Sequence, residues 1–413
     1  MHLRSVLAGA TAFALVGLTG APAQAVTVTC AESSPDGGGE AGISSAPFDQ
    51  LGLERAQQQV DDFAPPAGEP VRVAVLDSGV GAANADSIPV RKTVSYMPPD
   101  ADVSYFLGTE VAGLIAGADD GSRHVGFAPG TEIVDVRTYV DPTADDKELR
   151  PTSGTTARAL RWVAQNARDL NIKVATIAFP VSNGPGLRAA VEEAQAKDVV
   201  VVAATGDRVA PTDGTEPTAE ELRADDAATD SYPAAFPHVV AVNSTGDGYP
   251  DDPMSIVRAN SRTTVAAPTY HGVSYGLSGS SCAVDPISTG AAAAEVSGVV
   301  ALLWQMYRHD SAKQIIARLV NTANGTTDDP TPLTGAGVVQ PYEALTRPLD
   351  PGAKGDVERT VTQADVHPEA TAPVPAPDVL AETRDDAVWW GLIGGGLLVV
   401  ALLLRPVLAR RRS

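Results

Sequence analysis

Cysteine and basic residues are scarce in this chain, and each shortage excludes a class of function. Only two cysteines occur in 413 residues, and without paired histidines their spacing is not that of a zinc site. Lysine and arginine number 30 against 51 aspartates and glutamates, which gives a formal net charge of −21 at pH 7. Because nucleic-acid binding needs clustered basic residues, no nucleic acid partner is expected. No metal ion and no cofactor are expected either.

Aromatic residues and histidines are also few. Aromatic residues make up 5% of the chain and no internal repeat is visible, which argues against a structural cell-wall domain with carbohydrate-stacking clusters. The six histidines are His2, His124, His238, His271, His309 and His367. The first lies in the amino-terminal leader and the last in the tail, so four remain as candidates for general-base chemistry in the body.

The two ends of the chain predict export and a membrane anchor. Residues 1–25 have a basic start, the apolar run Val6 to Leu18 and a small-residue cleavage site at Ala23-Gln24-Ala25, which is the pattern of a signal peptide. Residues 387–404 are uncharged and begin near Trp389 and Trp390, and arginines follow them. This pattern predicts one transmembrane helix with the basic tail 405–413 in the cytoplasm and the body outside.

Between these ends the sequence divides into an amino-terminal extension, a body and a stalk. We assign the extension to residues 26–70, the body to 71–346 and a proline-rich acidic stalk to 347–386. Short β-branched apolar runs alternate with amphipathic segments in the body, which is typical of an α/β fold with a parallel central sheet flanked by helices. The predicted strands are Val71 to Leu76, Ile133 to Val136, Val174 to Phe179, Val199 to Ala204 and Val239 to Val242; the predicted helices include Thr155 to Asp169, Leu187 to Lys197 and Ala291 to Tyr307.

Four segments carry motifs in a fixed order. They are Val73-Ala74-Val75-Leu76-Asp77-Ser78-Gly79, Leu107-Gly108-Thr109-Glu110-Val111-Ala112-Gly113, Thr205-Gly206-Asp207, and Ser288-Thr289-Gly290 running through to Val296-Ser297-Gly298. Their order and residues resemble those of the subtilisin family of serine proteases. The resemblance implies a subtilisin-like three-layer fold and places Asp77 at the position of the triad aspartate.

The same resemblance implies that the rest of the catalytic machinery is replaced. Leu107 stands where the family has its histidine, and Gly290 stands where it has its nucleophilic serine. Asp207 stands where the family has the asparagine that donates to the oxyanion. Leucine cannot accept a proton, glycine has no hydroxyl, and an ionised carboxylate repels a developing oxyanion. We therefore expect a pseudoprotease.

A displaced triad is the alternative. Hydroxyl groups near the cleft are available at Ser278, Ser280, Ser281 and Ser288, but no histidine sits in a motif for a general base. The segment 213–230, directly after Asp207, is rich in acidic residues, and two interpretations stay open for it. It is either a solvated loop or a loop that docks a partner beside the old cleft.

In an oxidising exterior the two cysteines, Cys30 and Cys282, have only each other for an intramolecular bond, so we expect a disulfide between them. It would clamp the mature amino terminus to the loop before Gly290.

The whole layout resembles the mycosins, which are membrane-anchored subtilisin-like proteases of type VII secretion. Leu51-Gly52-Leu53-Glu54-Arg55-Ala56 sits where that family has its lead into the first catalytic strand. The resemblance implies association with the membrane components of a secretion system and with an exported protein or peptide. We expect a binding or scaffold role without hydrolysis; the alternative is an active serine endopeptidase that uses a displaced triad.

Overall fold

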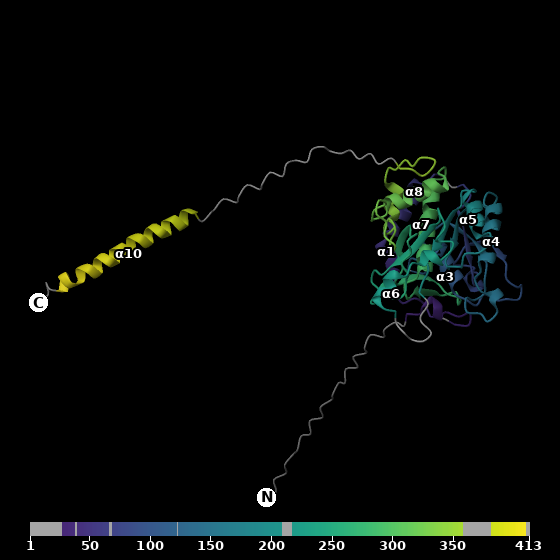
Figure 1. Cartoon of the computed structure of the whole chain (residues 1–413), viewed down its shortest axis with the longest axis horizontal. Helices are drawn as coiled ribbons and strands as arrows, with labels where there is room; N and C mark the ends of the chain where they lie inside the picture. Colours follow the sequence, from purple (N-terminus) through teal and green to yellow (C-terminus); the bar gives the residue numbers. More distant parts are fainter. Residues whose placement is uncertain are drawn as a thin grey trace, which may run out of the picture. The chain divides into compact units, whose positions relative to one another are not determined.

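The computed structural model describes residues 27–37, 39–65, 68–121, 123–208, 217–357 and 381–409. The chain forms two compact units, one ending at Glu358 and the other beginning at Arg359. The first unit is an α/β body, and the second contains one long helix (Figure 1). The predicted signal peptide and most of the predicted stalk lie outside the described residues.

Seven strands form one parallel sheet in the order β2-β3-β1-β4-β5-β6-β7. β1 is an inner strand of this sheet. It pairs with β3 from Arg72↔Glu132 to Asp77↔Arg137 and with β4 on its other side. The bounds are β1 Arg72–Asp77, β2 Val90–Ser95, β3 Glu132–Arg137, β4 Ile172–Ile177, β5 Val200–Ala204, β6 Val240–Thr245 and β7 Val265–Pro268. The predicted parallel sheet is confirmed.

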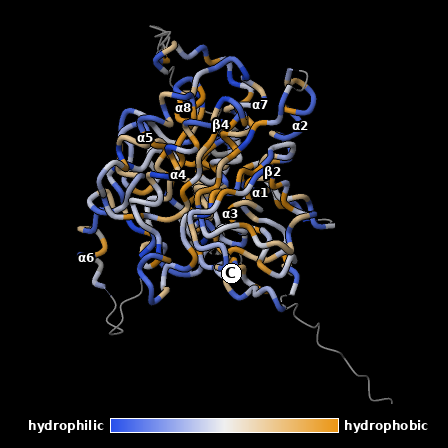
Figure 2. The backbone as a smooth tube through the Cα atoms, turned by 90° about the vertical axis from the view of Figure 1, so that its right-hand side faces the viewer, coloured by the Kyte–Doolittle hydropathy of each residue, from blue (hydrophilic) through white to orange (hydrophobic). Residues whose placement is uncertain are grey.

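Helices cover both faces of this sheet, so its strands are buried on each side. The helices α4 (Ser153–Asn166) and α5 (Leu187–Gln195) cover one face. The other face carries α3 (Leu107–Ala116), α7 (Thr289–Met306), α8 (Ala312–Thr322) and α9 (Pro341–Thr346). Apolar segments gather in the interior between these layers (Figure 2). Two cores result, one on each face of the sheet.

The amino-terminal extension packs on the α7 side of the body. It contains the short 3-10 helix η1 (Cys30–Glu32) and the helices α1 (Ala46–Gln50) and α2 (Leu53–Phe63). Phe48 and Leu53 are buried in the same core as α7. A disulfide joins Cys30 to Cys282, which confirms the predicted bond.

A two-stranded antiparallel hairpin lies against α3. Its strands are β8 (Gly272–Tyr275) and β9 (Ser281–Val284), and the Ser274 hydroxyl donates to the Glu110 carbonyl at 2.6 Å. The remaining elements are α6 (Ala219–Ala224) and the 3-10 helices η2 (Ala82–Asn84), η3 (Lys147–Leu149), η4 (Ala227–Thr229) and η5 (Pro253–Ser255).

The residues that follow α9 remain packed against the body. Arg318 donates to the Leu349 carbonyl and Gln314 to the Pro351 carbonyl, both at 2.8 Å, so the start of the predicted stalk packs on α8. In the second unit, α10 (Ala381–Ala409) is an apolar helix. Its apolar stretch, Asp385–Arg405, has 21 residues and is long enough to cross a membrane.

Candidate functional site

Asp77, the residue predicted at the triad aspartate position, is the last residue of β1 and is fully buried. Its Oδ1 accepts hydrogen bonds from the Tyr139 hydroxyl at 2.7 Å and from the Ser78 amide at 2.8 Å. Burial raises the pKa of Asp77 to about 7, against the lowering effect of both hydrogen bonds. Tyr139 thus donates to the carboxylate that, in an active triad, would orient a histidine.

Leu107 is the first residue of α3 and packs partly buried against the core on the α7 side. The Ser78 hydroxyl fastens the end of β1 to this helix, because it accepts from the Gly108 amide at 3.0 Å and donates to the Tyr105 carbonyl at 2.9 Å. The fold therefore brings the start of α3 to the end of β1. A leucine at this point has no atom that can accept a proton.

Asp207 lies beyond the end of β5 and caps the amino terminus of α7. Its Oδ1 accepts from the Thr289 amide at 2.8 Å, and its Oδ2 accepts from the Ser288 hydroxyl at 3.2 Å. Burial raises the pKa of Asp207, while its bonds to Thr289 and Ser288 act in the opposite direction. An acidic side chain therefore uses donors at the helix terminus that could otherwise bind an anion.

Gly290, the second residue of α7, sits against the backbone of the loop that follows β4. A Cβ atom placed on Gly290 would lie 2.6 Å from the Ala178 carbonyl oxygen and 3.3 Å from the Ser288 hydroxyl oxygen. The first distance is too short for any side chain unless the backbone shifts. Gly290 therefore has no reactive side chain, and its surroundings leave no room for one.

The buried rings of Tyr139 and Phe179 connect Asp77 with the surroundings of Gly290. The Tyr139 ring lies edge-on to Phe179, with 4.7 Å between ring centroids, and both side chains are buried. Tyr139 holds Asp77, and Phe179 follows the Ala178 carbonyl that faces Gly290. The two packed rings thus join Asp77 to the backbone segment that faces Gly290.

Glu110 of α3 and Glu295 of α7 add two buried carboxyl groups to this region. Burial, with repulsion from Asp77 and Asp207, raises the pKa of Glu110 to about 8. The pKa of Glu295 is raised well above its ordinary value by burial and then by repulsion from Glu110. Among the described residues, no group of three or more His, Cys, Asp or Glu side chains is arranged to hold a metal ion.

Sequence reasoning missed Tyr139, Glu110 and Glu295. A signal for the two glutamates was available, since each is an isolated acidic residue in an otherwise apolar helical stretch. No comparable local signal marks Tyr139, which lies 62 residues from Asp77.

Three of the four hydroxyl groups considered for a displaced triad, those of Ser278, Ser281 and Ser288, have other partners. The Ser288 hydroxyl accepts from the Gly290 and Ala291 amides and donates to Asp207, so it acts as the amino-terminal cap of α7. The Ser278 hydroxyl pairs with Ser33, and the Ser281 hydroxyl donates to Asp120. The Ser280 amide donates to the Ser278 hydroxyl.

The described histidines do not supply a base to these hydroxyls. The His124 ring stacks on Phe48 and its Nδ1 lies 3.2 Å from an Asp119 oxygen. The His271 ring stacks on Tyr270. No hydrogen bond joins either ring, or His238 or His309, to one of these serines within the described part of the chain.

Part of the acidic segment 213–230 is tied to the body by ion pairs. Asp225 accepts from Arg208 at 2.8 Å and from Arg258 at 2.7 Å, and Asp230 pairs with Arg258 at 2.9 Å. These contacts lower the pKa of Asp225. Residues 209–216 lie outside the described residues, so within this segment the structure bears only on residues 217–230.

The parallel sheet and the buried central helix α7 define a subtilisin-like fold. The chain belongs to the subtilase family, whose model matches residues 68–340.

Mycosin-5 of Mycobacterium tuberculosis is 30% identical over 323 residues, which cover 70% of this chain and 53% of Mycosin-5. The solved structure of the MycP3 protease from the type VII (ESX-3) secretion system matches with a TM-score of 0.57 at 26% identity, covering 78% of this chain and 91% of that one. A chain in an intact ESX-5 inner membrane complex shares the fold, with a TM-score of 0.57 at 23% identity, over 92% of this chain and 93% of its own length. The predicted resemblance to mycosins is confirmed.

Proposed function

We propose that this chain is a membrane-anchored pseudoprotease that serves as a binding or scaffold component of a type VII secretion system and hydrolyses no peptide bond. The observation that carries the proposal is the lack of a reactive side chain at Gly290 and of space for one. Gly290 has no hydroxyl, and the Ala178 carbonyl occupies the space that a side chain would need. An acyl-enzyme cannot form at a residue that lacks a nucleophile.

The electrostatics at the other positions support the same conclusion. A serine protease stabilises a developing oxyanion with preorganised donors, and loss of one donor costs roughly 3 to 4 kcal/mol of transition-state stabilisation. Here the Thr289 amide already donates to the Asp207 carboxylate. A substrate carbonyl would have to displace that carboxylate and then carry negative charge beside it.

The partners are inferred from the relatives. The MycP3 relative belongs to a type VII secretion system, and a chain of the same fold is part of an ESX-5 inner membrane complex. This chain has the same fold and an apolar helix of sufficient length, so membrane components of such a system are the proposed partners. An exported protein or peptide is a second proposed partner.

The proposed orientation places the body outside the cytoplasm. Trp389 and Trp390 lie near one end of the apolar stretch, and Arg405 with the arginines at 410–412 lies at the other. Tryptophan favours the membrane interface and arginine favours the cytoplasmic side. The signal peptide predicted for residues 1–25 agrees with this orientation.

An active protease with a displaced triad is the alternative, and one contact bears on it. The Ser288 hydroxyl lies 3.2 Å from an Asp207 oxygen, so a hydroxyl and a carboxylate are paired near the old nucleophile position. However, the Ser288 oxygen also accepts from two backbone amides of α7. An oxygen used as a helix cap is poorly placed to attack a substrate.

The full-length protein in detergent should be exposed to a fluorophosphonate probe and to a peptide library, beside an active subtilisin as the positive control. We expect neither labelling nor cleavage. Labelling that disappears in a Ser288→Ala variant would instead establish the displaced triad. A Leu107→Val variant, which leaves all serines in place, serves as the matched control.

The scaffold role needs its own experiment. Full-length protein should be crosslinked in the membranes of its native host, and its partners identified by mass spectrometry. We expect membrane components of a type VII system, with an unrelated single-span membrane protein as the control. Recovery of those components to the same extent with the control would contradict the role.

A further inference from the structure

A hollow of about 270 Å³ lies in the body at the edge of the sheet where β1 and β4 begin. Its lining includes one acidic residue, three cationic residues and a tryptophan, which are Glu69, Arg168, Lys173, Arg308 and Trp304. Asp77 is the last residue of β1, so this hollow is separate from the candidate site at the opposite edge of the sheet.

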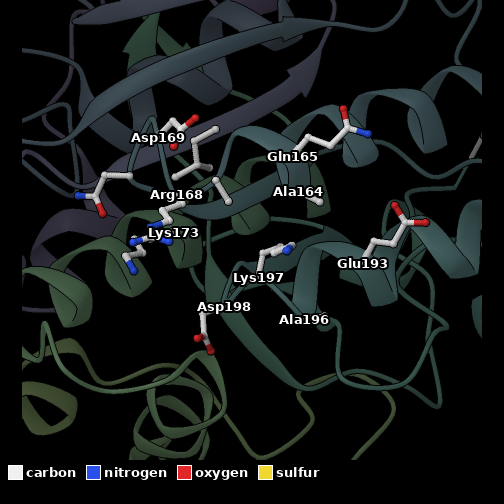
Figure 3. Close-up of a pocket in the computed structure, with 12 residues that line it drawn as sticks. Ala164, Gln165, Arg168, Asp169, Lys173, Glu193, Ala196, Lys197 and Asp198 are labelled. Atoms are coloured by element: carbon white, nitrogen blue, oxygen red, sulfur yellow. The ribbon is translucent and has the colours of Figure 1, made fainter.

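The small hollow has a positive charge balance that its larger neighbour lacks. Three cationic side chains against one carboxylate leave two positive charges. The adjoining hollow of about 800 Å³ shares Arg168 and Lys173, but it is lined by three cations and three carboxylates and has no net charge. Arg168 and Lys173 lie at one end of this larger hollow, away from Glu193 (Figure 3). The excess of positive charge is therefore confined to the small hollow, which we call the cationic hollow.

The three cations of the cationic hollow have no ion-pair partner within 4 Å among the described residues. The one acidic side chain of the lining, Glu69, lies 3.8 Å from Arg72. Arg308 donates to the main-chain carbonyl of Glu69 at 3.4 Å, which leaves its charge without a carboxylate. The positive charge is therefore available to an external anion.

Lys173 is held at the wall of the hollow by an aromatic ring. Its Nζ atom lies 4.5 Å from the centre of the Trp304 ring, and Trp304 is buried. A cation–π contact fixes the position of an ammonium group without neutralising its charge. Lys173 is therefore in place before an anion binds.

Two N–H groups of the lining residues lack an acceptor. The indole N–H of Trp304 and the Nε–H of Arg308 are buried and have no hydrogen-bond partner in the described part of the chain. Buried polar groups in folded proteins are nearly always hydrogen-bonded. A ligand rich in oxygen atoms would supply the acceptors that these residues lack.

Hydrogen bonds from side chains to the backbone hold the rim of the cationic hollow. The side-chain amide of Asn171 donates to the Pro70 carbonyl at 2.9 Å, and Arg72 donates to the Leu170 carbonyl at 2.7 Å. These bonds join the turn before β4 to the segment before β1. The rim is thus preorganised, which lowers the entropic cost of binding a ligand there.

We propose that the cationic hollow binds a phosphate group, either free or carried by a larger molecule. A phosphate monoester carries about −1.5 to −2 charges at pH 7 and three strong acceptor oxygens. This charge matches the two positive charges of the hollow, and arginine and lysine are both common phosphate ligands. A carboxylate offers only one charge and two oxygens. The proposal depends neither on the membrane anchor nor on whether the chain hydrolyses peptides.

The first test uses the full-length protein in detergent. Sodium phosphate, sodium chloride and sodium acetate are titrated in parallel at equal ionic strength, and tryptophan fluorescence is followed because Trp304 lines the hollow. We expect a saturable change with phosphate and none with the other two salts. The absence of a saturable change with phosphate, or binding of acetate with equal affinity, would overturn the proposal.

Variants locate the bound phosphate. Arg308→Gln and Lys173→Gln should each raise the Kd for phosphate several-fold, measured by isothermal titration calorimetry. Lys197→Gln removes one cation from the larger hollow only and should leave the Kd unchanged. Trp304→Phe should lose the fluorescence change. An equal rise in Kd in all three charge variants would overturn the proposal, because net charge alone would then be responsible, and so would an unchanged Kd in both Arg308→Gln and Lys173→Gln.

A comparison of ligands identifies the source of the phosphate group. O-phosphoserine should bind with a Kd similar to or lower than that of inorganic phosphate if the natural ligand is a larger molecule, and with a higher Kd if it is free phosphate. Either order supports a phosphate site. L-serine is the matched control, and binding of L-serine as tight as that of O-phosphoserine would contradict the site.

Discussion

Gly290 and Gly154 are each the second residue of a helix, α7 and α4, but their surroundings differ. A Cβ on Gly290 would meet the Ala178 carbonyl oxygen at 2.6 Å, whereas on Gly154 it would meet nothing closer than 3.9 Å. We expect Gly290→Ala to lower the free energy of unfolding by about 1 to 3 kcal/mol. Gly154→Ala should leave it unchanged or raise it by up to about 1 kcal/mol. Urea denaturation of both variants checks this, and a Gly290→Ala variant of full stability would show that the site can open.

Tyr139 offers a second test at single-residue scale. Its hydroxyl donates to Asp77, and charge-assisted hydrogen bonds contribute about 1.5 to 3 kcal/mol. Tyr139→Phe should therefore destabilise the protein by that amount at pH 8, where Asp77 with its pKa of about 7 is ionised, and by less at pH 5. Tyr96→Phe removes a hydroxyl that donates to the Arg158 carbonyl and should show no such pH dependence. An equal loss of stability in Tyr139→Phe at both pH values would contradict the proposed hydrogen bond to an ionised Asp77.

Motif order along the chain predicts Asp77, Leu107, Asp207 and Gly290 as the site positions without any knowledge of contacts. What those positions touch depends on residues far away in the sequence. Folding of the sheet brings the Ala178 carbonyl against Gly290. It also brings the Tyr139 hydroxyl to Asp77. For this reason the sequence predicts that Leu107 and Gly290 carry no reactive groups, but it could not predict how tightly the backbone packs around Gly290.

At the scale of elements, β1 and α3 bury carboxyl groups that make stability depend on pH. Burial raises the pKa values of Asp77 and Glu110 in the folded protein to about 7 and about 8, from ordinary values of 3.8 and 4.5. Since raised acid pKa values favour the protonated folded state, their contribution is complete below about pH 4 and is lost as pH rises to about 8. We expect ionisation of each group to lower the free energy of unfolding by on the order of 2 to 4 kcal/mol over that pH range.

Glu110→Gln tests this dependence, because the amide cannot ionise. Denaturation curves of the variant and the natural protein should be measured side by side at each pH. Between pH 5 and pH 8 the variant should lose less stability than the natural protein. Glu193→Gln, at an exposed position of α5, is the control and should follow the natural curve. A Glu110→Gln curve parallel to the natural one would show that Glu110 stays protonated or is solvated on ionisation.

Elements with strong apolar periodicity were predicted within a few residues. The run Val199 to Ala204 became β5 (Val200–Ala204), and Leu187 to Lys197 became α5 (Leu187–Gln195). Elements without such a pattern were missed. The edge strand β2 carries exposed Arg91 and Lys92, and β8 and β9 have only four residues each. Short or exposed strands take their conformation from their neighbours, which sequence patterns do not show.

At the scale of the whole molecule, the disulfide joins residues 252 positions apart. In the loop-entropy model a closed loop of this length restricts the unfolded chain, and its loss costs about 2 to 5 kcal/mol. We expect Cys30→Ser with Cys282→Ser to lower the melting temperature of the full-length protein by several degrees, measured by differential scanning fluorimetry in detergent. The natural protein under reducing conditions should approach the same value. An unchanged melting temperature in the double variant would show that the packing of α1 and α2 suffices to hold the extension.

The same disulfide encloses the entire seven-stranded sheet, because Cys30 precedes β1 and Cys282 follows β7. Under the proposed export from the amino terminus, Cys30 would reach the oxidising side first, and Cys282 would arrive only after the sheet-forming residues have passed. The early thiol must remain reduced, or be exchanged, throughout that interval. Correct pairing is therefore a matter of timing between translocation and oxidation, and slow export would favour crosslinks between neighbouring copies of the chain.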